Sequence, residues 1–309
     1  MSRTILDRLS EVAKTSFVGR QKELAVLRDA IEAAELLFVV IFIHGLGGIG
    51  KTRLLRTTLT SVGSQIRSIV MDCHEIEPTP NGFLAALGAA LRIQESEPEL
   101  CSVVACLGKI EGRFVLTLDN YETFGLMDTW LRQVFAPALP ETVLTIIISR
   151  QAPNAAWLTT PGWEGLFCEI KLQALPDDDA HRMLKLRGLT QLQVERVNRF
   201  ARGYPLALEL AAAALRNQPD LEIVGDSPPK VLQQLTRFFL AGLPSETTEA
   251  IEAASTVRRV TEPVLKTLLD VSYVRELFDK LQDLPFINAT SEGLILHDVV
   301  RDTIANDLA

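Results

Sequence analysis

Continuous apolar runs alternate with amphipathic stretches through the first half of the chain. The run at 36–43 ends in a glycine cluster, as expected of a strand that is buried on both faces of a parallel sheet. Similar runs occupy 66–71, 114–118 and 143–148, and a weaker one occupies 166–172. Helical spacing between them predicts helices at 52–59, 82–91 and 126–134. This alternation predicts a doubly wound α/β domain.

Helical periodicity dominates the rest of the chain. It also precedes the first strand, where Ile5, Leu9 and Val12 share one helical face. The turn-rich segment 225–230 predicts a linker, and two short strand-like runs around a Ser-Glu-Gly turn predict a hairpin at 286–297. A last helix follows from Asp298. Helices followed by a hairpin describe a winged helix, so we predict an α/β domain at 1–173, a helical domain at 174–226 and a winged-helix domain at 227–309.

Composition narrows the class of protein. The chain has 309 residues and a formal net charge of −8, an acidic balance that disfavours nucleic acid and anionic membranes as partners. The longest apolar run is far shorter than the roughly 20 residues of a membrane helix. No targeting peptide is evident, and the four cysteines lack the spacing of a metal site. We therefore expect a cytoplasmic protein with free thiols and no membrane partner.

The strongest chemical signal is the segment GLGGIGKT at 45–52, which fits the phosphate-binding loop pattern GxxxxGK[ST]. It lies between a predicted buried strand and a predicted helix, where such a loop must lie. Glycines allow the backbone N–H groups to point inward at an anion. Lys51 supplies a charge for the β- and γ-phosphates, and Thr52 supplies a hydroxyl ligand for Mg²⁺. The expected cofactors are ATP or ADP and Mg²⁺.

Two later strands end in further candidates. FVLTLD at 114–119 places Asp119 where a second Mg²⁺ partner is needed. The next residue is Asn120 rather than an acid, so Glu122 is the nearest carboxylate that could activate water; its alternative is a solvated loop acid. Arg150 ends another strand on the ligand side and suits a γ-phosphate, unless it is an ordinary surface arginine.

Six motifs in order resemble the nucleotide-binding module of STAND-class AAA+ ATPases, of the NB-ARC-like type. They are FVGR at 17–20, GLGGIGKT at 45–52, LDNYE at 118–122, ISR at 148–150, GYPLA at 203–207 and LHD at 296–298. The sequence departs from the usual pattern at Asn120, at Tyr204, where the family has Leu, and at Leu296, where it has Met. Asn120 and Tyr204 put the rate of hydrolysis in doubt.

The resemblance implies roles for matched positions. Val18 and Gly19 would flank the adenine, Arg20 would stabilise that pocket, Pro205 would pack on the nucleotide, and His297 would reach the β-phosphate of ADP. The alternatives are a helix-interrupting structural proline and a histidine at the end of the hairpin that caps the last helix. The predicted nucleotide-binding positions are Val18, Gly19, Arg20, Gly45, Gly47, Gly48, Ile49, Gly50, Lys51, Thr52, Arg53, Pro205 and His297. The predicted catalytic positions are Lys51, Asp119, Glu122 and Arg150, and the metal positions are Thr52 and Asp119.

The function that the resemblance implies is a slow ATPase switch. ADP would hold a closed resting state, and ATP would open it and allow self-association, in concert with a sensor or effector that is not part of this chain. One alternative is a DNA-loading AAA+ protein of the origin-recognition type. From 228 to 309 there are 8 Lys and Arg against 12 Asp and Glu, and Arg258–Arg259 is the only basic cluster, so DNA is an unfavoured partner. A metabolic kinase is a further alternative, without a recognisable substrate lid.

Overall fold

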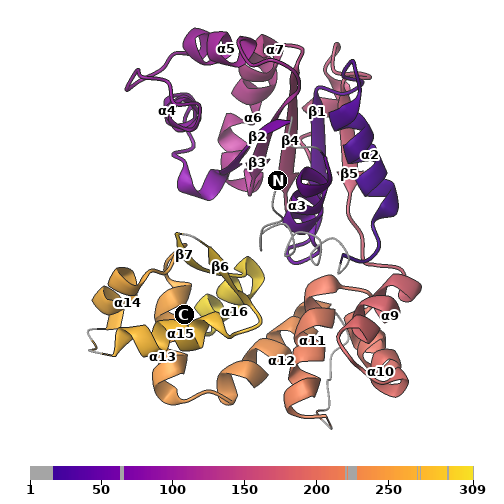
Figure 1. The fold of residues 1–309 in the computed structure, drawn as a ribbon, viewed down its shortest axis with the longest axis vertical. Coiled ribbons are helices and arrows are strands. Elements are labelled where there is room, and N and C mark those ends of the chain that lie inside the picture. Colours follow the sequence, from indigo (N-terminus) through magenta and orange to yellow (C-terminus); the bar gives the residue numbers. More distant parts are fainter. Residues whose placement is uncertain are drawn as a thin grey trace, which may run out of the picture. The chain divides into compact units, whose positions relative to one another are not determined.

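The computed structural model describes residues 17–62, 66–219, 221, 228–269, 271, 273–290 and 292–308 of the chain (Figure 1). The chain folds into two compact units. The first runs up to Leu46 and continues through Gly50–Gln173; the second comprises Gly47–Ile49 and Ala174–Ala309. The division into three domains stays a prediction.

Some predicted features lie outside the described residues. They are the helical face of Ile5, Leu9 and Val12, residues 225–227 of the linker and Ser291 of the hairpin turn. No helix in the described part of the chain is both long enough and apolar enough to cross a membrane.

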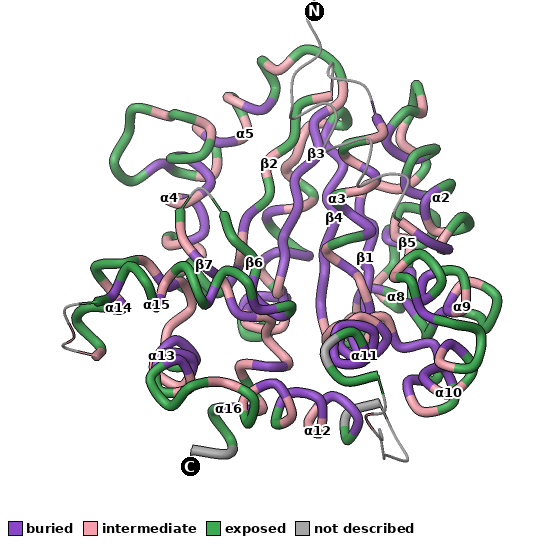
Figure 2. Tube along the Cα trace, turned by 60° about the horizontal axis from the view of Figure 1, so that its bottom comes forward, coloured by how far each residue is buried: buried purple, intermediate pink, exposed green. Residues whose placement is uncertain are grey.

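The first unit contains the predicted parallel sheet, with five strands in the order β2–β3–β4–β1–β5. All five predicted strands are confirmed: β1 (Val40–His44), β2 (Arg67–Asp72), β3 (Phe114–Asp119), β4 (Val143–Ser149) and β5 (Phe167–Lys171). The first strand begins four residues later than predicted: Leu37 is still 68% exposed, and bonding to the neighbouring segments starts only at Val39, whose N–H donates to the carbonyl oxygen of Leu166 at 2.8 Å. Every residue of β1, β3 and β4 is buried, as Figure 2 shows for these central strands.

Register brings the carboxyl ends of the strands level with one another. Asp72 of β2 pairs with Asp119 of β3, and His44 of β1 pairs with both Ser149 of β4 and Lys171 of β5. Since β4 lies between β3 and β1, the residue after Ser149 emerges between the loop that follows β1 and the end of β3. The sheet therefore collects five polar strand ends along one edge.

Helices connect the strands of this unit: α2 (Gln21–Glu32), α3 (Lys51–Ser61), α4 (Pro80–Ala90), α5 (Leu100–Gly108), α6 (Asp128–Trp130), α7 (Ala136–Ala138) and α8 (Ala156–Thr159). The predicted helices at 52–59 and 82–91 are confirmed by α3 and α4. Thr79 begins α4 by accepting a hydrogen bond from the backbone N–H of Gly82 at 3.1 Å, with Pro80 in the first turn. Alternate strand residues such as Val40 and Phe42 join the large aromatic core that α4 and α5 cover.

Two helical predictions for this unit need correction. The sequence pattern predicts no helix at α5, where apolar and small residues give no clear polar face. The predicted helix at 126–134 is irregular: a 3₁₀ helix (Tyr121–Met127) leads into α6, which continues into a π-helical turn (Leu131–Phe135). Aromatic side chains explain the irregularity, because Phe124, Trp130 and Phe135 all pack edge-on or stacked around the same core.

The second unit is helical and ends in the predicted hairpin and last helix. Its elements are α9 (Asp177–Leu186), α10 (Gln191–Ala201), α11 (Pro205–Asn217), α12 (Pro228–Ala241), α13 (Ser245–Ser255), α14 (Glu262–Leu269), α15 (Val274–Gln282), β6 (Ile287–Thr290), β7 (Gly293–Leu296) and α16 (Asp298–Leu308). The antiparallel hairpin is extended by a bridge between Val260 and Leu294. Three helices, a hairpin with this third short segment and a final helix agree with the order expected of a winged helix.

Candidate functional site

The phosphate-binding loop follows β1 and leads into α3. Gly45, Gly48 and Gly50 have φ values of 151°, 80° and 97°, so the loop uses its glycines for backbone shapes that other residues rarely adopt. Gly50 is the N-cap of α3 and no side chain caps the helix. Glycine contributes no capping side chain, and the N-terminal end of a helix favours an anion.

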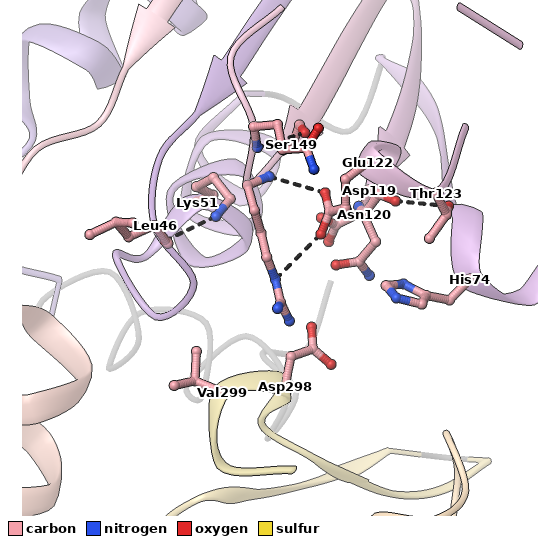
Figure 3. A network of polar contacts seen from close by, with 12 residues as sticks. Leu46, Lys51, His74, Asp119, Asn120, Glu122, Thr123, Ser149, Asp298 and Val299 are labelled. Atoms are coloured by element: carbon pink, nitrogen blue, oxygen red, sulfur yellow. Dashed lines mark hydrogen bonds and ion pairs between the residues drawn. The ribbon is translucent and has the colours of Figure 1, made fainter. Parts of the chain in front are cut away.

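Lys51 lies against this loop with only 9% of its surface exposed. Its ammonium donates to the carbonyl oxygen of Gly45 at 2.7 Å and to that of Leu46 at 3.1 Å (Figure 3). A flexible lysine that is held on the loop in this way lies close to where phosphate oxygens would bind.

Thr52 and Asp119 meet across the sheet. The Thr52 hydroxyl, in the first turn of α3, donates to Oδ2 of Asp119 at the end of β3 at 2.9 Å, although β4 separates β3 from the strand β1 that leads to α3. Hydroxyl and carboxylate oxygens are the ligands that Mg²⁺ prefers, completed by water and substrate phosphates. Within the described residues no cluster of three or more His, Cys, Asp or Glu side chains could hold a metal ion. Thr52 and Asp119 therefore fit a magnesium ion that arrives with a nucleotide.

Asp119 is electrostatically unusual, since only 9% of it is exposed. Burial raises the pKa of its carboxyl, against the lowering effect of hydrogen bonds from the Thr52 hydroxyl and the Asn120 backbone N–H. The charge of Asp72 raises this pKa further, and Lys51 lowers it. Burial disfavours the charged form of this carboxyl group, and a bound cation would compensate for that cost.

We expect Asp119→Asn to stabilise the protein at pH 7 by about 1 kcal/mol while it removes a metal ligand. Because the folded-state pKa is raised, the native carboxyl binds its proton more tightly than the unfolded one, and its destabilising effect appears as the pH rises through the folded pKa. The difference between variant and parent should shrink as the pH is lowered from 7 towards about 4. Urea unfolding at a series of pH values measures this; a variant that is less stable than the parent at pH 7 contradicts it.

Asn120 follows Asp119 in a left-handed conformation, with φ of 57°. Its side-chain amide donates to Oδ1 of Asp72 at 2.8 Å, and the backbone N–H of His74 donates to the same oxygen at 3.1 Å. Asp72 is not among the predicted site residues. The signal that could have found it is the same as for Asp119, an apolar run that ends in Asp, since IRSIVMD closely matches FVLTLD.

Glu122 and Arg150 contact each other. Oε1 of Glu122 lies 3.3 Å from Nε of Arg150, and Oε2 accepts the backbone N–H of Arg150 at 3.0 Å (Figure 3). The candidate base and the candidate γ-phosphate ligand thus form one pair on the same edge of the sheet as Lys51 and Asp119. Their predicted roles remain predictions.

The FVGR turn lies in the first unit, before α2. Val18 is buried, and Gly19 and Arg20 have φ of 74° and 62°. Arg20 pairs with Glu23 at 3.3 Å and also donates to the carbonyl oxygen of Gln173. In this structure its guanidinium ties the turn to the end of the first unit.

Inside the second unit, the tip of the glycine loop contacts the GYPLA motif. The backbone N–H of Leu206 donates to the carbonyl oxygen of Gly48 at 3.3 Å. A Cβ at Gly48 would lie 2.9 Å from Cδ2 of Leu206 and 3.3 Å from the Tyr204 hydroxyl. Pro205 occupies the first turn of α11, so it begins this helix and does not interrupt one, and Ile49 is buried.

His297 lies between β7 and α16. Its Nδ1 accepts the backbone N–H of Val299 at 3.4 Å, and its carbonyl accepts those of Val300 and Arg301. This is the helix-capping arrangement that is the alternative to a nucleotide contact.

The basic pair Arg258–Arg259 is neutralised within the second unit. Arg258 forms an ion pair with Asp298, which also pairs with Arg301 at 2.8 Å, and Arg259 forms one with Glu292. Both guanidinium groups, which are partly exposed, are thus engaged by carboxylates of the hairpin and α16.

Comparisons with solved structures show the fold. The chain resembles a STAND protein with a tetratricopeptide repeat sensor from Pyrococcus horikoshii, with 19% identity and a TM-score of 0.62 over 94% of this chain. The chain spans only 42% of that protein. It also resembles a Walker-type ATPase of Pyrococcus abyssi, with 14% identity and a TM-score of 0.52 over 93% of this chain and 96% of that one. A further similar structure is that of Drosophila ORC bound to DNA, with 15% identity and a TM-score of 0.50 over 94% of each chain. The α/β fold is that of the P-loop NTPases.

No curated protein matches the sequence. A family model described as an AAA ATPase domain matches residues 16–284, and this family implies nucleotide binding, usually with Mg²⁺. The match covers well over half of the chain, which therefore belongs to the AAA ATPase domain family.

Proposed function

We propose that this chain is an ATP- and ADP-binding switch of the STAND class that hydrolyses ATP slowly. Binding rests on Lys51, Thr52 and Asp119 as described. The observation that carries the switch is the Glu122–Arg150 pair, because Arg150 would have to exchange Glu122 for a γ-phosphate when ATP replaces ADP. The site would then respond to the one group that distinguishes the two nucleotides.

Slow hydrolysis follows from the residues beside Asp119. Asn120 cannot act as a base, and its amide is held by Asp72. Glu122 carries the nearest following carboxylate and is engaged by Arg150. An ATPase whose base is withheld in this way suits a switch, which must stay in one state for a long time, better than a motor.

The proposed resting state is a clasp around ADP, made by the phosphate-binding loop, the Pro205 region and His297. A ligand shifts an equilibrium only through its different affinities for two states. A change from 1:99 to 99:1 requires about 5.5 kcal/mol. Charge-assisted contacts contribute about 1.5–3 kcal/mol each, so two to three of them, made by Lys51, the loop N–H groups and His297 in the closed state alone, are sufficient for this. ATP would favour the open state and self-association, and a sensor or effector beyond this chain would supply the signal.

The nucleotide retained through purification tests the proposal. We expect chromatography of the denatured protein to release ADP in near-stoichiometric amount. A protein that retains no nucleotide and binds neither ATP nor ADP by calorimetry contradicts the proposal.

His297 is the most informative position for the clasp. If His297 contacts the diphosphate, His297→Ala and His297→Asn should both weaken ADP binding about tenfold. Asn is a good helix cap, so it should restore the melting temperature that Ala lowers but not the affinity. Calorimetry with ADP and thermal melting separate the two effects; parent-like affinity in both variants assigns His297 to capping alone.

The alternative is a DNA-binding AAA+ protein, which is favoured by the likeness to Drosophila ORC bound to DNA. The pairing of Arg258 with Asp298 and of Arg259 with Glu292 weighs against it, since these guanidinium groups would have to leave carboxylates for phosphates. Binding to duplex DNA that weakens steeply with salt would support the alternative.

A further inference from the structure

A buried carboxylate joins two loops of the candidate site. Asp128, at the start of α6, is only 4% exposed. Its Oδ1 accepts hydrogen bonds from the Tyr121 hydroxyl at 2.9 Å and from the Trp157 indole N–H at 2.7 Å. Both rings are almost fully buried, at 4% and 1% exposure.

The two donors come from the two segments that carry Glu122 and Arg150. Tyr121 immediately precedes Glu122, and Trp157 lies in α8, the first helix after Arg150. A single carboxylate oxygen therefore connects the loop after β3 with the segment after β4. The nearby Arg132 strengthens this connection, since its Nη1 donates to Thr160 Oγ1 at 3.0 Å and its Nε lies 4.0 Å from Oδ2 of Asp128.

The arrangement uses polar groups where stability alone would favour apolar ones. Burial raises the pKa of the Tyr121 phenol, and the neighbouring Asp128 raises it further, so the hydroxyl stays a donor throughout the physiological range. Oδ2 of Asp128 and Nε of Arg132 are buried without a hydrogen-bond partner among the described residues. Apolar packing commonly replaces such buried charges without loss of stability. The buried charges of Asp128 and Arg132 are explained if they serve to fix the positions of the two loops.

We infer that Asp128 is a positioning residue, which holds the Glu122 loop and the Arg150 loop in contact through Tyr121 and Trp157. The consequence for hydrolysis rests on the proposed function, because it assumes that Glu122 and Arg150 act on nucleotide. The positioning itself does not, because the Glu122–Arg150 contact is a property of the protein alone.

Hydrogen exchange of the Arg150 backbone amide measures this contact directly, since that N–H donates to Oε2 of Glu122. Tyr121→Phe removes one hydroxyl and keeps the ring. We expect the Arg150 amide to exchange about five- to tenfold faster in this variant, while the amide of Ile147 inside β4 is unchanged. Asp128→Asn keeps the acceptor oxygen and should change the Arg150 rate by less than about threefold.

Thr160→Val is the matched comparison, because it removes the weaker Arg132 link between the same two segments and leaves both donors on Asp128 in place. It should accelerate the Arg150 amide clearly less than Tyr121→Phe does. The inference is overturned if the Arg150 amide exchanges at the same rate in Tyr121→Phe as in the parent. It is also overturned if Thr160→Val accelerates this exchange as much as Tyr121→Phe does. These outcomes do not depend on nucleotide, so they remain decisive even if the protein binds none.

Hydrolysis gives a second readout that a merely structural role would not move. In Tyr121→Phe we expect kcat to rise about fivefold, because Arg150 withholds Glu122 less, while the Kd for ADP stays within about twofold of the parent value. A loss of ADP affinity together with a fall in kcat would instead indicate general damage to the fold and would count against positioning.

Discussion

Replacement of Lys51 by alanine is expected to abolish measurable binding of both ATP and ADP. The ammonium is buried against the carbonyl oxygens of Gly45 and Leu46, at the N-terminal end of α3. Its removal takes away the charge nearest to the expected phosphates, and we expect affinity to fall at least about 100-fold. Calorimetry with ADP and with ATP and Mg²⁺ measures the change.

Lys109→Ala is the matched control, because it removes the same charge from the exposed end of α5. It should leave both affinities unchanged. If the Kd values of Lys51→Ala stay within about threefold of the parent, the loop at 45–52 does not bind nucleotide as proposed.

Gly203→Ala is expected to destabilise the protein severely. Gly203 has a φ of 71°, and a Cβ there would lie 2.1 Å from the carbonyl oxygen of Leu175. The same glycine accepts the N–H of Leu175 at 2.8 Å and donates its own N–H to Oδ1 of Asn198 at 3.1 Å. The colliding atom belongs to the backbone of Leu175, which cannot move away by a change of rotamer as a side chain could. We expect a loss of at least about 3 kcal/mol, measured by urea unfolding followed through the helical circular dichroism signal.

Gly188→Ala separates backbone strain from the clash. Gly188 has a similar φ of 84°, but nothing lies within 4 Å of a Cβ at that position. This substitution should cost only about 1 kcal/mol. Equal losses in the two variants would show that conformational strain, and not the approach of Leu175, explains the need for glycine in the GYPLA motif.

The fold of the first unit was predictable because its central strands are buried on both faces. Runs such as FVLTLD and VLTIIIS hold a single threonine each within the strand core, and that threonine is buried, so they lack the polar stripe of an amphipathic helix. The helix α5 was not predictable in this way, since LCSVVACLG has no polar stripe. The π-helical turn at Leu131–Phe135 depends on how Phe83, Trp130 and Phe135 pack, and that packing depends on the rest of the core.

The candidate site was predictable where a local sequence motif indicates the binding role of its residues, as for Lys51 and Thr52. Asp119 followed from the requirement for a second metal ligand, and its bond with Thr52 fits that expectation. Asp72 ends an apolar run as Asp119 does, but the groups that Asp72 and Asp128 contact could not be predicted from the sequence. Their partners lie on other strands or loops, and the order of strands in the sheet decides which of them meet. No periodicity along the chain encodes that order.

The buried thiol of Cys73 has a practical use. Cys73 follows Asp72 at the end of β2 and is only 1% exposed. Burial raises the pKa of its thiol, and the charges of Asp72, Asp119 and Glu122 raise it further. Alkylating reagents attack thiolates, so Cys73 reacts only when this edge of the sheet opens, whereas the exposed Cys101 is accessible at once. The rate at which Cys73 is labelled therefore reports how often the protein opens locally beside Asp119. A bound nucleotide that suppresses this opening would lower the labelling rate.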